Sequence, residues 1–119
     1  MPPVDTPYLA GLDLRERRVV VVGGGTVAQR RLATLLDAGA SVLLVSPEAT
    51  PAVEGMAQAG ELRWHRRRYA AGDLADAWYA LALTDDPAVN AAVVAEASRR
   101  RVFCVRGDEI GRASCRERV

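Results

Sequence analysis

The sequence predicts an α/β fold in which helices cover a parallel sheet of about five strands. Short apolar runs rich in valine and leucine alternate with segments of helical periodicity along the 119-residue chain. The first apolar run, Val19–Val22, is followed at once by three glycines and then by a helical pattern. Strand, glycine turn and helix in this order are typical of a single doubly wound, Rossmann-like domain.

The first helix is expected to begin near Thr26 and to stop at Gly39. Its apolar residues lie three and four positions apart and therefore share one face: Leu32, Leu35 and Leu36. Glycine commonly follows the last residue of a helix, which fits Gly39. The next apolar run, Ser41–Ser46, predicts a second strand, and a helical crossover of this length makes the two strands parallel neighbours.

The glycine turn is the stretch that points to a ligand. Gly23 permits a tight turn out of the strand, and Gly25, which has no Cβ atom, lets a pyrophosphate approach the backbone. Ala28 allows the helix to pack closely against the strand. The backbone N–H groups at the start of the helix favour negative charge. The turn therefore predicts dinucleotide binding; the alternative is a turn in another kind of α/β domain.

The remaining elements continue the alternation of strands and helices. They are a helix over Pro51–Ala59, a strand over Glu61–Trp64, a strand over Ala77–Leu83, a helix over Pro87–Arg100 and a strand over Val102–Val105. Ala77–Leu83 is apolar throughout, which predicts a strand buried on both faces. The segment Tyr69–Leu74 is typical of a turn that opens a short helical segment.

Two loops that follow predicted strands carry acidic residues. Glu48 stands at about the spacing at which nucleotide-binding folds place a carboxylate on the adenosine ribose, although it follows Pro47 in a loop. A solvated or helix-capping Glu48 is the alternative. Asp85 either caps the next helix or contacts a cofactor or substrate. Residues 46–51 contain no arginine, which favours NAD over NADP.

Charge and composition bear on the choice of partner. The net charge is +1, so bulk electrostatics recruits neither nucleic acid nor an anionic membrane. No apolar run is long enough to cross a membrane, and the N-terminus does not resemble a secretory signal, so we expect a cytoplasmic protein. Cys104 and Cys115 form no metal-ligand or disulfide pattern, and no metal site is expected. The basic run Arg66–Arg68 either meets an acidic substrate or forms a solvated edge.

The last residues, Glu109–Val119, break the pattern. They show neither strand nor helix periodicity, and the string is similar to a translated sequencing adapter. We therefore expect a domain over residues 1–108, followed by a non-native tail over residues 109–119 that packs poorly. The domain would then be a truncated part of a longer parent.

Four segments carry a resemblance to a known family. In chain order they are Tyr8-Leu9, Val19–Ala28, Leu83–Asn90 and Arg101–Cys104, the last leading to Asp108. Together they resemble the precorrin-2 dehydrogenases, which form the N-terminal module of siroheme synthases. The resemblance implies NAD-dependent oxidation of precorrin-2, a tetrapyrrole, to sirohydrochlorin in siroheme biosynthesis. Some members also insert ferrous iron into the product. The full-length parent is expected to form a homodimer.

The resemblance also implies roles for individual residues, matched by position. The cofactor pyrophosphate would be held by Gly23, Gly25, Thr26 and Val27. Pro47 and Glu48 would lie beside the adenosine, and Thr84 and Asp85 would line the nicotinamide side. Asp108 matches the family's essential aspartate, the expected general base for the proton lost from the macrocycle. The alternative for Asp108 is a plain turn residue.

Two other function classes are alternatives to the dehydrogenase. A non-catalytic NAD-binding regulatory module usually has an acidic residue directly at the end of its second strand, where this chain has Ser46 and Pro47. Such a module would need no aspartate at position 108. A short-chain dehydrogenase is disfavoured, because its Tyr-x-x-x-Lys pair cannot exist in a chain without lysine.

Overall fold

The computed structural model describes residues 10–107, and these form one α/β unit. The elements in chain order are β1 (Arg18–Val22), α1 (Thr26–Asp37), β2 (Ser41–Val45), α2 (Pro51–Gln58), β3 (Arg63–His65), β4 (Tyr79–Ala82), α3 (Pro87–Arg100) and β5 (Phe103–Arg106). The five strands form one sheet in the order β3-β2-β1-β4-β5, and every neighbouring pair is parallel. The predicted fold class is therefore confirmed.

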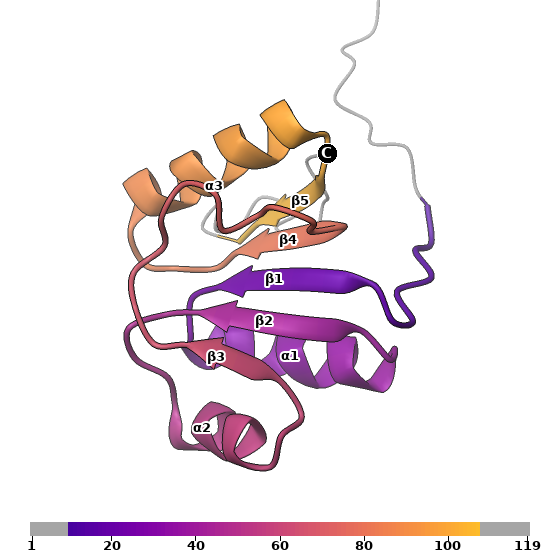
Figure 1. Cartoon of the computed structure of the whole chain (residues 1–119). Coiled ribbons are helices and arrows are strands. Elements are labelled where there is room, and N and C mark those ends of the chain that lie inside the picture. Colours follow the sequence, from indigo (N-terminus) through magenta and orange to yellow (C-terminus); the bar gives the residue numbers. More distant parts are fainter. Residues whose placement is uncertain (1–9, 108–119) are drawn as a thin grey trace, which may run out of the picture.

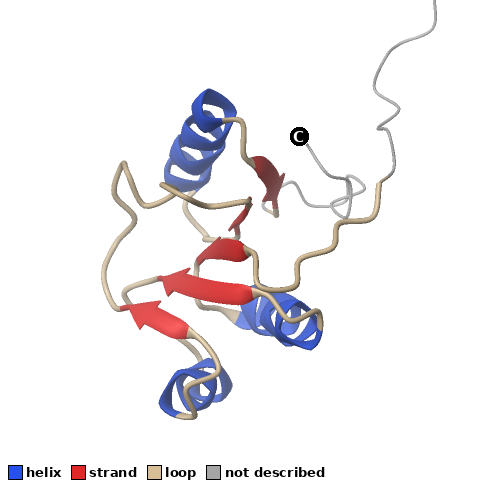
Figure 2. Ribbon diagram, turned by 45° about the vertical axis from the view of Figure 1, so that its right-hand side comes forward, coloured by secondary structure: helices blue, strands red, loops and turns tan. Residues whose placement is uncertain are grey.

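Helices cover both faces of the sheet (Figure 1). Helices α1 and α2 lie on one face and α3 lies on the other, as the turned view in Figure 2 also shows. Alternate residues of β1 supply the two cores: Val19 and Val21 pack toward α1 and α2, whereas Val20 and Val22 pack toward α3. All four valines are buried, which is why this strand reads as an unbroken apolar run.

Helix α1 matches its prediction. Leu32 and Leu35 are buried and Leu36 is half-buried, so the leucine face meets the sheet. Ala28 is fully buried at the point where the helix approaches β1. Gly39 has a φ of 80°, in the left-handed region that ends helices.

The main departures from the prediction lie around β3 and β4. Strand β3 is short and covers Arg63–His65, while β4 covers only Tyr79–Ala82. The short helix expected after Tyr69 does not form, and residues 71–76 are turns instead. One physical reason is that Gly72 has a φ of 101°, which is not a helical value. The other is that backbone N–H groups of this segment donate to the Glu96 side chain of α3 and not to helical carbonyls.

The order in which strands are added to the sheet reverses at β1. Strands β2 and β3 extend to one side of it, and β4 and β5 extend to the other. In open parallel sheets a crevice forms outside the carboxyl ends of the strands at such a switch point. The fold therefore places the glycine turn, which follows β1, at the mouth of this crevice.

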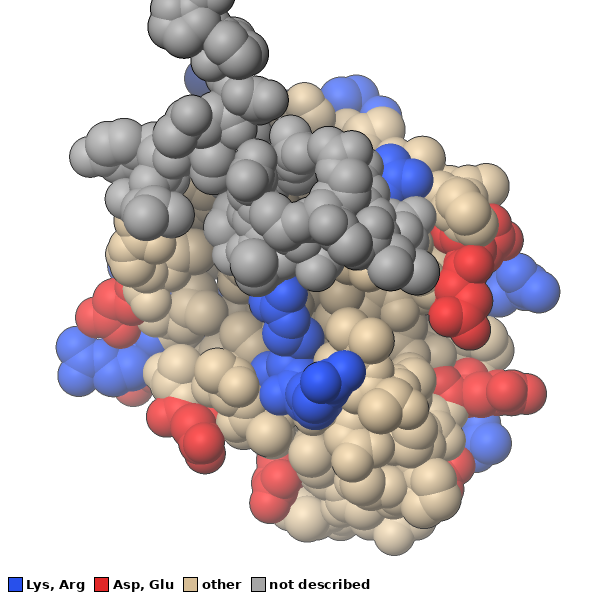
Figure 3. Space-filling view, turned by 180° about the vertical axis from the view of Figure 1, so that it is seen from behind, with Lys and Arg blue, Asp and Glu red and all other residues tan. Residues whose placement is uncertain are grey.

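The surface carries both signs of charge. On the face seen in Figure 3, basic and acidic side chains are interspersed with uncharged surface, as expected for a net charge of +1. Within residues 10–107, none of the helices is long and apolar enough to cross a membrane.

Candidate functional site: a dinucleotide cleft at the carboxyl edge of the sheet

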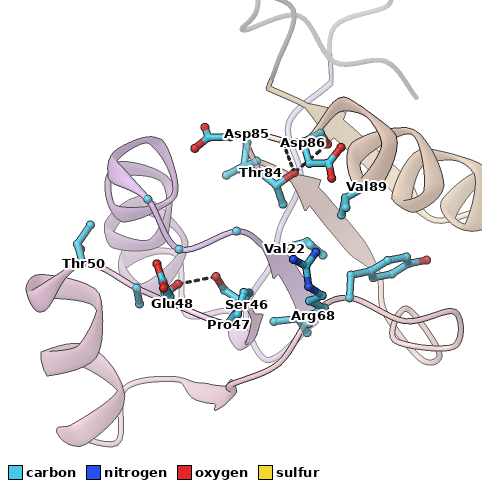
Figure 4. A pocket seen from close by; sticks show the side chains of 17 residues that line it. Val22, Ser46, Pro47, Glu48, Thr50, Arg68, Thr84, Asp85, Asp86 and Val89 are labelled. Carbon is cyan, nitrogen blue, oxygen red and sulfur yellow. Dashed lines mark hydrogen bonds between the residues drawn. The ribbon is translucent and has the colours of Figure 1, made fainter.

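A cavity of 470 Å³ lies at the carboxyl ends of β1, β2 and β4 (Figure 4). Its wall consists of Val22 and the glycine turn, the loop of residues 45–50 after β2, residues 68–69 before β4, residues 83–86 after β4, and Val89 of α3. The volume is in the range of ligand sites in proteins. Six predicted site residues meet here: Gly23, Gly25, Pro47, Glu48, Thr84 and Asp85.

Each of the three glycines of the turn is glycine for a different structural reason. Gly23 has a φ of 117°, and a Cβ atom there would come within 2.7 Å of the Leu83 carbonyl oxygen. A Cβ atom on Gly24 would overlap the carbonyl oxygen of Glu48. A Cβ atom on Gly25 would meet no protein atom within 4 Å, although Gly25 lines the cavity. Only the third glycine therefore leaves space that a ligand can use.

The start of α1 offers free backbone donors. Gly25 is the N-cap residue and provides no side-chain cap. The first N–H group with an acceptor inside the helix is that of Gln29, which donates to the Gly25 carbonyl (2.9 Å). The N–H groups of Thr26 and Val27 precede it and have no acceptor within the helix. The side chains of Thr26 and Val27 are exposed and do not line the cavity, so these residues can contribute only backbone groups to a phosphate.

The loop after β2 is held in place on the glycine turn. Thr50 N–H donates to the Gly24 carbonyl (3.0 Å), and the Thr50 hydroxyl donates to Oε1 of Gln29 on α1 (2.8 Å). Trp64 Nε1 donates to the Ser46 carbonyl (2.9 Å) from β3. The loop is therefore fixed before any ligand binds.

Glu48 lies on this loop with an exposed side chain and lines the cavity together with Pro47. The residue that caps α2 is Thr50, whose hydroxyl oxygen accepts from Val53 N–H (3.3 Å). The helix-capping alternative for Glu48 is thus wrong. Its contact with an adenosine ribose stays a prediction.

The loop after β4 is built around a buried amide. Asn90 of α3 is fully buried, and its Oδ1 accepts from the Thr84 N–H (3.1 Å) and the Thr84 hydroxyl (2.8 Å). Its Nδ2 donates back to the Thr84 carbonyl (2.9 Å). Thr84 therefore lines the cavity with its hydroxyl already engaged. The sequence predicted no role for Asn90, and its six-residue spacing from Thr84 is the signal that could have indicated one.

The cap of α3 is Asp86, not Asp85. The Asp86 side chain accepts from Ala88 N–H (2.9 Å), and Pro87 begins the helix. The capping alternative for Asp85 is therefore wrong by one residue. Asp85 is exposed, lines the cavity, and extends its carboxylate from the loop (Figure 4). Its side chain is thus available to a ligand.

A buried carboxylate fastens the segment between β3 and β4 to α3. Glu96 is only 1% exposed, and its Oε2 accepts from the N–H groups of Gly72 (3.1 Å) and Leu74 (3.3 Å). The Tyr69 hydroxyl and Arg100 Nε (2.7 Å) also donate to this carboxylate. Burial by itself would raise the pKa of Glu96, but the hydrogen bonds outweigh burial and lower that pKa below its usual value. Burial and the bond to Glu96 both raise the pKa of Tyr69.

Asp108, the predicted general base, lies outside the described residues, as does the tail of residues 109–119. The described chain ends at Gly107, whose N–H donates to the Ala82 carbonyl at the end of β4 (3.0 Å). Within residues 10–107, no three side chains of the metal-binding types lie close enough together to hold an ion. Cys104 is buried in β5.

Comparison with known proteins agrees with the geometry of the cleft. Residues 10–115 match a family described as putative NAD(P)-binding. The chain belongs to this NAD(P)-binding family. The match confirms the prediction of an NAD-type dinucleotide cofactor. It also overlaps residues 109–115, whose assignment to a non-native tail stays a prediction.

Individual relatives bear out the predicted resemblance. The chain is 41% identical over 102 residues to siroheme synthase 1 of Serratia proteamaculans (strain 568), an alignment that covers 86% of this chain and 21% of that protein. It is 37% identical over 101 residues to precorrin-2 dehydrogenase of Bacillus subtilis (strain 168), an alignment that covers 84% of this chain and 62% of that protein. The solved structure of SirC, precorrin-2 dehydrogenase, matches with a TM-score of 0.68 and 36% identity over 71% of this chain and 43% of that one. The chain thus spans less than two thirds of each relative.

Proposed function

We propose that this chain holds NAD for the oxidation of precorrin-2 to sirohydrochlorin, as the dinucleotide-binding part of a siroheme-forming enzyme. The observation that carries the proposal is Gly25: it faces open space in the cleft, next to unused N–H groups at the start of α1. The similarity to siroheme synthase 1 and to precorrin-2 dehydrogenase supports the substrate. We further propose that the whole protein is a cytoplasmic homodimer, and that iron insertion is a second activity it could share with siroheme synthases.

Each part of the cleft has a task in this proposal. NAD, when bound, supplies the acceptor for a hydride. The backbone of Gly23, Gly25 and the first turn of α1 binds the pyrophosphate, because its N–H groups and the helix dipole favour negative charge. Pro47 and Glu48 border the adenosine.

The loop after β4 and the end of β5 serve the reacting side. Thr84 and Asp85 border the nicotinamide, on a loop that Asn90 holds rigid. We propose that the Asp108 carboxylate takes the proton lost from the macrocycle. The support in the described chain is Gly107, its last residue, whose N–H donates to the Ala82 carbonyl at the carboxyl end of β4.

The first test is NAD binding by this chain, measured by isothermal titration calorimetry. Gly25→Ala is expected to fold normally and to lose NAD binding, because the added methyl group projects into the cavity. Equal binding by Gly25→Ala and the unchanged chain would contradict the assignment of the cleft.

The second test is turnover by the whole protein. Precorrin-2 and NAD should yield the absorbance of sirohydrochlorin, and Asp108→Ala should abolish this while leaving NAD binding intact. Normal turnover by Asp108→Ala would remove the general-base assignment. NAD binding without any turnover by the whole protein would instead favour a non-catalytic NAD-binding module.

A further inference from the structure

The three consecutive arginines after β3 have different surroundings. The Arg66 guanidinium lies over the Trp64 ring, 5.0 Å from its centroid. Arg67 forms an ion pair with Asp73 (2.6 Å). Arg68 turns the other way and lines the dinucleotide cleft, with its guanidinium directed into the cavity toward Val22 (Figure 4). The basic run is thus neither a uniform solvated edge nor a uniform patch.

Arg68 is the sole basic residue in the described wall of the cleft. The acidic residues in that wall are Glu48, Asp85 and Asp86. In the part of the chain that the structure describes, the ion pairs engage Arg15, Arg67 and Arg100, and Arg68 takes part in none. A cationic side chain therefore faces the cavity with its charge not neutralised by a neighbouring carboxylate.

The residues on either side hold Arg68 in this position. Arg67 is bound to Asp73 through both carboxylate oxygens (2.6 and 2.9 Å). The Tyr69 hydroxyl donates to the buried Glu96 carboxylate. Because both neighbours are fixed, little backbone freedom is lost when the Arg68 guanidinium binds a ligand.

The cleft also needs a counter-charge. A dinucleotide pyrophosphate carries two negative charges, and the glycine turn offers only backbone dipoles: α1 has no charged side chain in its first turn, Thr26–Gln29. Three carboxylates in the wall would oppose an anion. A guanidinium binds phosphate oxygens with charge-assisted hydrogen bonds.

We propose that Arg68 binds the phosphate oxygens of the dinucleotide from the side of the cleft opposite the glycine turn. This inference rests on the proposed function, since it takes a dinucleotide as the ligand. In this proposal Arg68 recognises the pyrophosphate of the cofactor and not its two nucleosides.

The test compares Arg68→Gln with Arg66→Gln, which removes the same charge from the same segment but outside the cleft. Calorimetric titrations with NAD, ADP-ribose and adenosine separate the phosphate contact from the nucleoside contact. Arg68→Gln should weaken NAD and ADP-ribose roughly tenfold, the effect of one lost hydrogen bond between charged groups at an exposed site. Adenosine binding should not change, and Arg66→Gln should bind all three ligands normally. Arg68→Lys should keep most of the affinity because it keeps the charge.

The loss caused by Arg68→Gln should shrink as salt is added, because salt screens a contact of this kind. Equal loss of adenosine and NAD binding would overturn the inference in favour of a nucleoside contact. Unchanged NAD binding by Arg68→Gln would overturn it while leaving the proposed function intact. Failure of the unchanged chain to bind NAD at all would overturn both.

Discussion

Replacing Glu96 by glutamine should destabilise the whole domain although Glu96 touches no ligand. The carboxylate of Glu96 accepts four hydrogen bonds, three from the segment between β3 and β4 and one from α3 itself, and it is almost fully buried. Glutamine has nearly the same shape but only one acceptor oxygen. Its NH2 group would face either the donors Gly72, Leu74 and Arg100, or the Tyr69 hydroxyl, which would then have to accept and would lose the acceptor for its own proton.

The size of the effect follows from these contacts. At least one donor among Tyr69, Gly72 and Leu74 loses its acceptor, and the bond from Arg100 loses its ionic character. One lost charge-assisted bond and one unpaired donor together cost about 2–4 kcal/mol of unfolding free energy. This is a large part of the stability of a small domain.

Urea denaturation followed by tryptophan fluorescence measures the change. The midpoint should fall while the slope of the transition stays constant, since the native surface is unchanged. Glu61→Gln is the matched control, because Glu61 is exposed and forms none of the ion pairs found in the described residues. It should shift the unfolding free energy by less than about 0.5 kcal/mol. Equal midpoints for the two variants would refute the reasoning.

The same carboxylate makes stability depend on pH. Because the pKa of Glu96 is lower in the folded chain than its usual value of 4.5, its contribution is complete above that value and is lost as the pH falls through the folded pKa. The unchanged chain should therefore lose stability in acid faster than Glu96→Gln. Asp73, whose pKa is lowered first of all by Arg67, acts in the same direction. A difference between the two chains that stayed constant below pH 4.5 would contradict this explanation.

Further substitutions test the turn and the loop after β4. Gly24→Ala should cost about 1–3 kcal/mol, because the new Cβ atom would overlap the Glu48 carbonyl oxygen, whereas Gly25→Ala should change the melting temperature little. Asp86→Ala should cost about 1 kcal/mol through loss of the α3 cap, and Asp85→Ala should leave thermal stability unchanged. A stability loss for Asp85→Ala equal to that for Asp86→Ala would contradict the cap assignment.

The sequence predicted best those features that neighbouring residues determine. The run of valines, the glycine turn and the leucine face of α1 lie within one stretch of chain, so periodicity and turn chemistry sufficed to place them. Pro87 likewise marked the start of α3, and the predicted end at Arg100 is also the observed one.

Features that depend on distant residues were not predicted. The requirement for glycine at position 24 comes from the loop that carries Glu48, and the failure of residues 71–76 to form a helix comes from Glu96. A buried glutamate in α3 looks like any surface glutamate in sequence. The different orientations of Arg66 and Arg68 follow from the partners that the fold brings near them, which composition cannot show.

The crossover between β3 and β4 has a consequence for motion. It forms one wall of the cleft with no helix of its own, and it is attached mainly through Glu96 and the burial of Leu74. Detaching it breaks no bond between strands, so this wall can open as a small unfolding unit while the sheet stays intact. Amide hydrogen exchange at Gly72 and Leu74 then reports the opening directly.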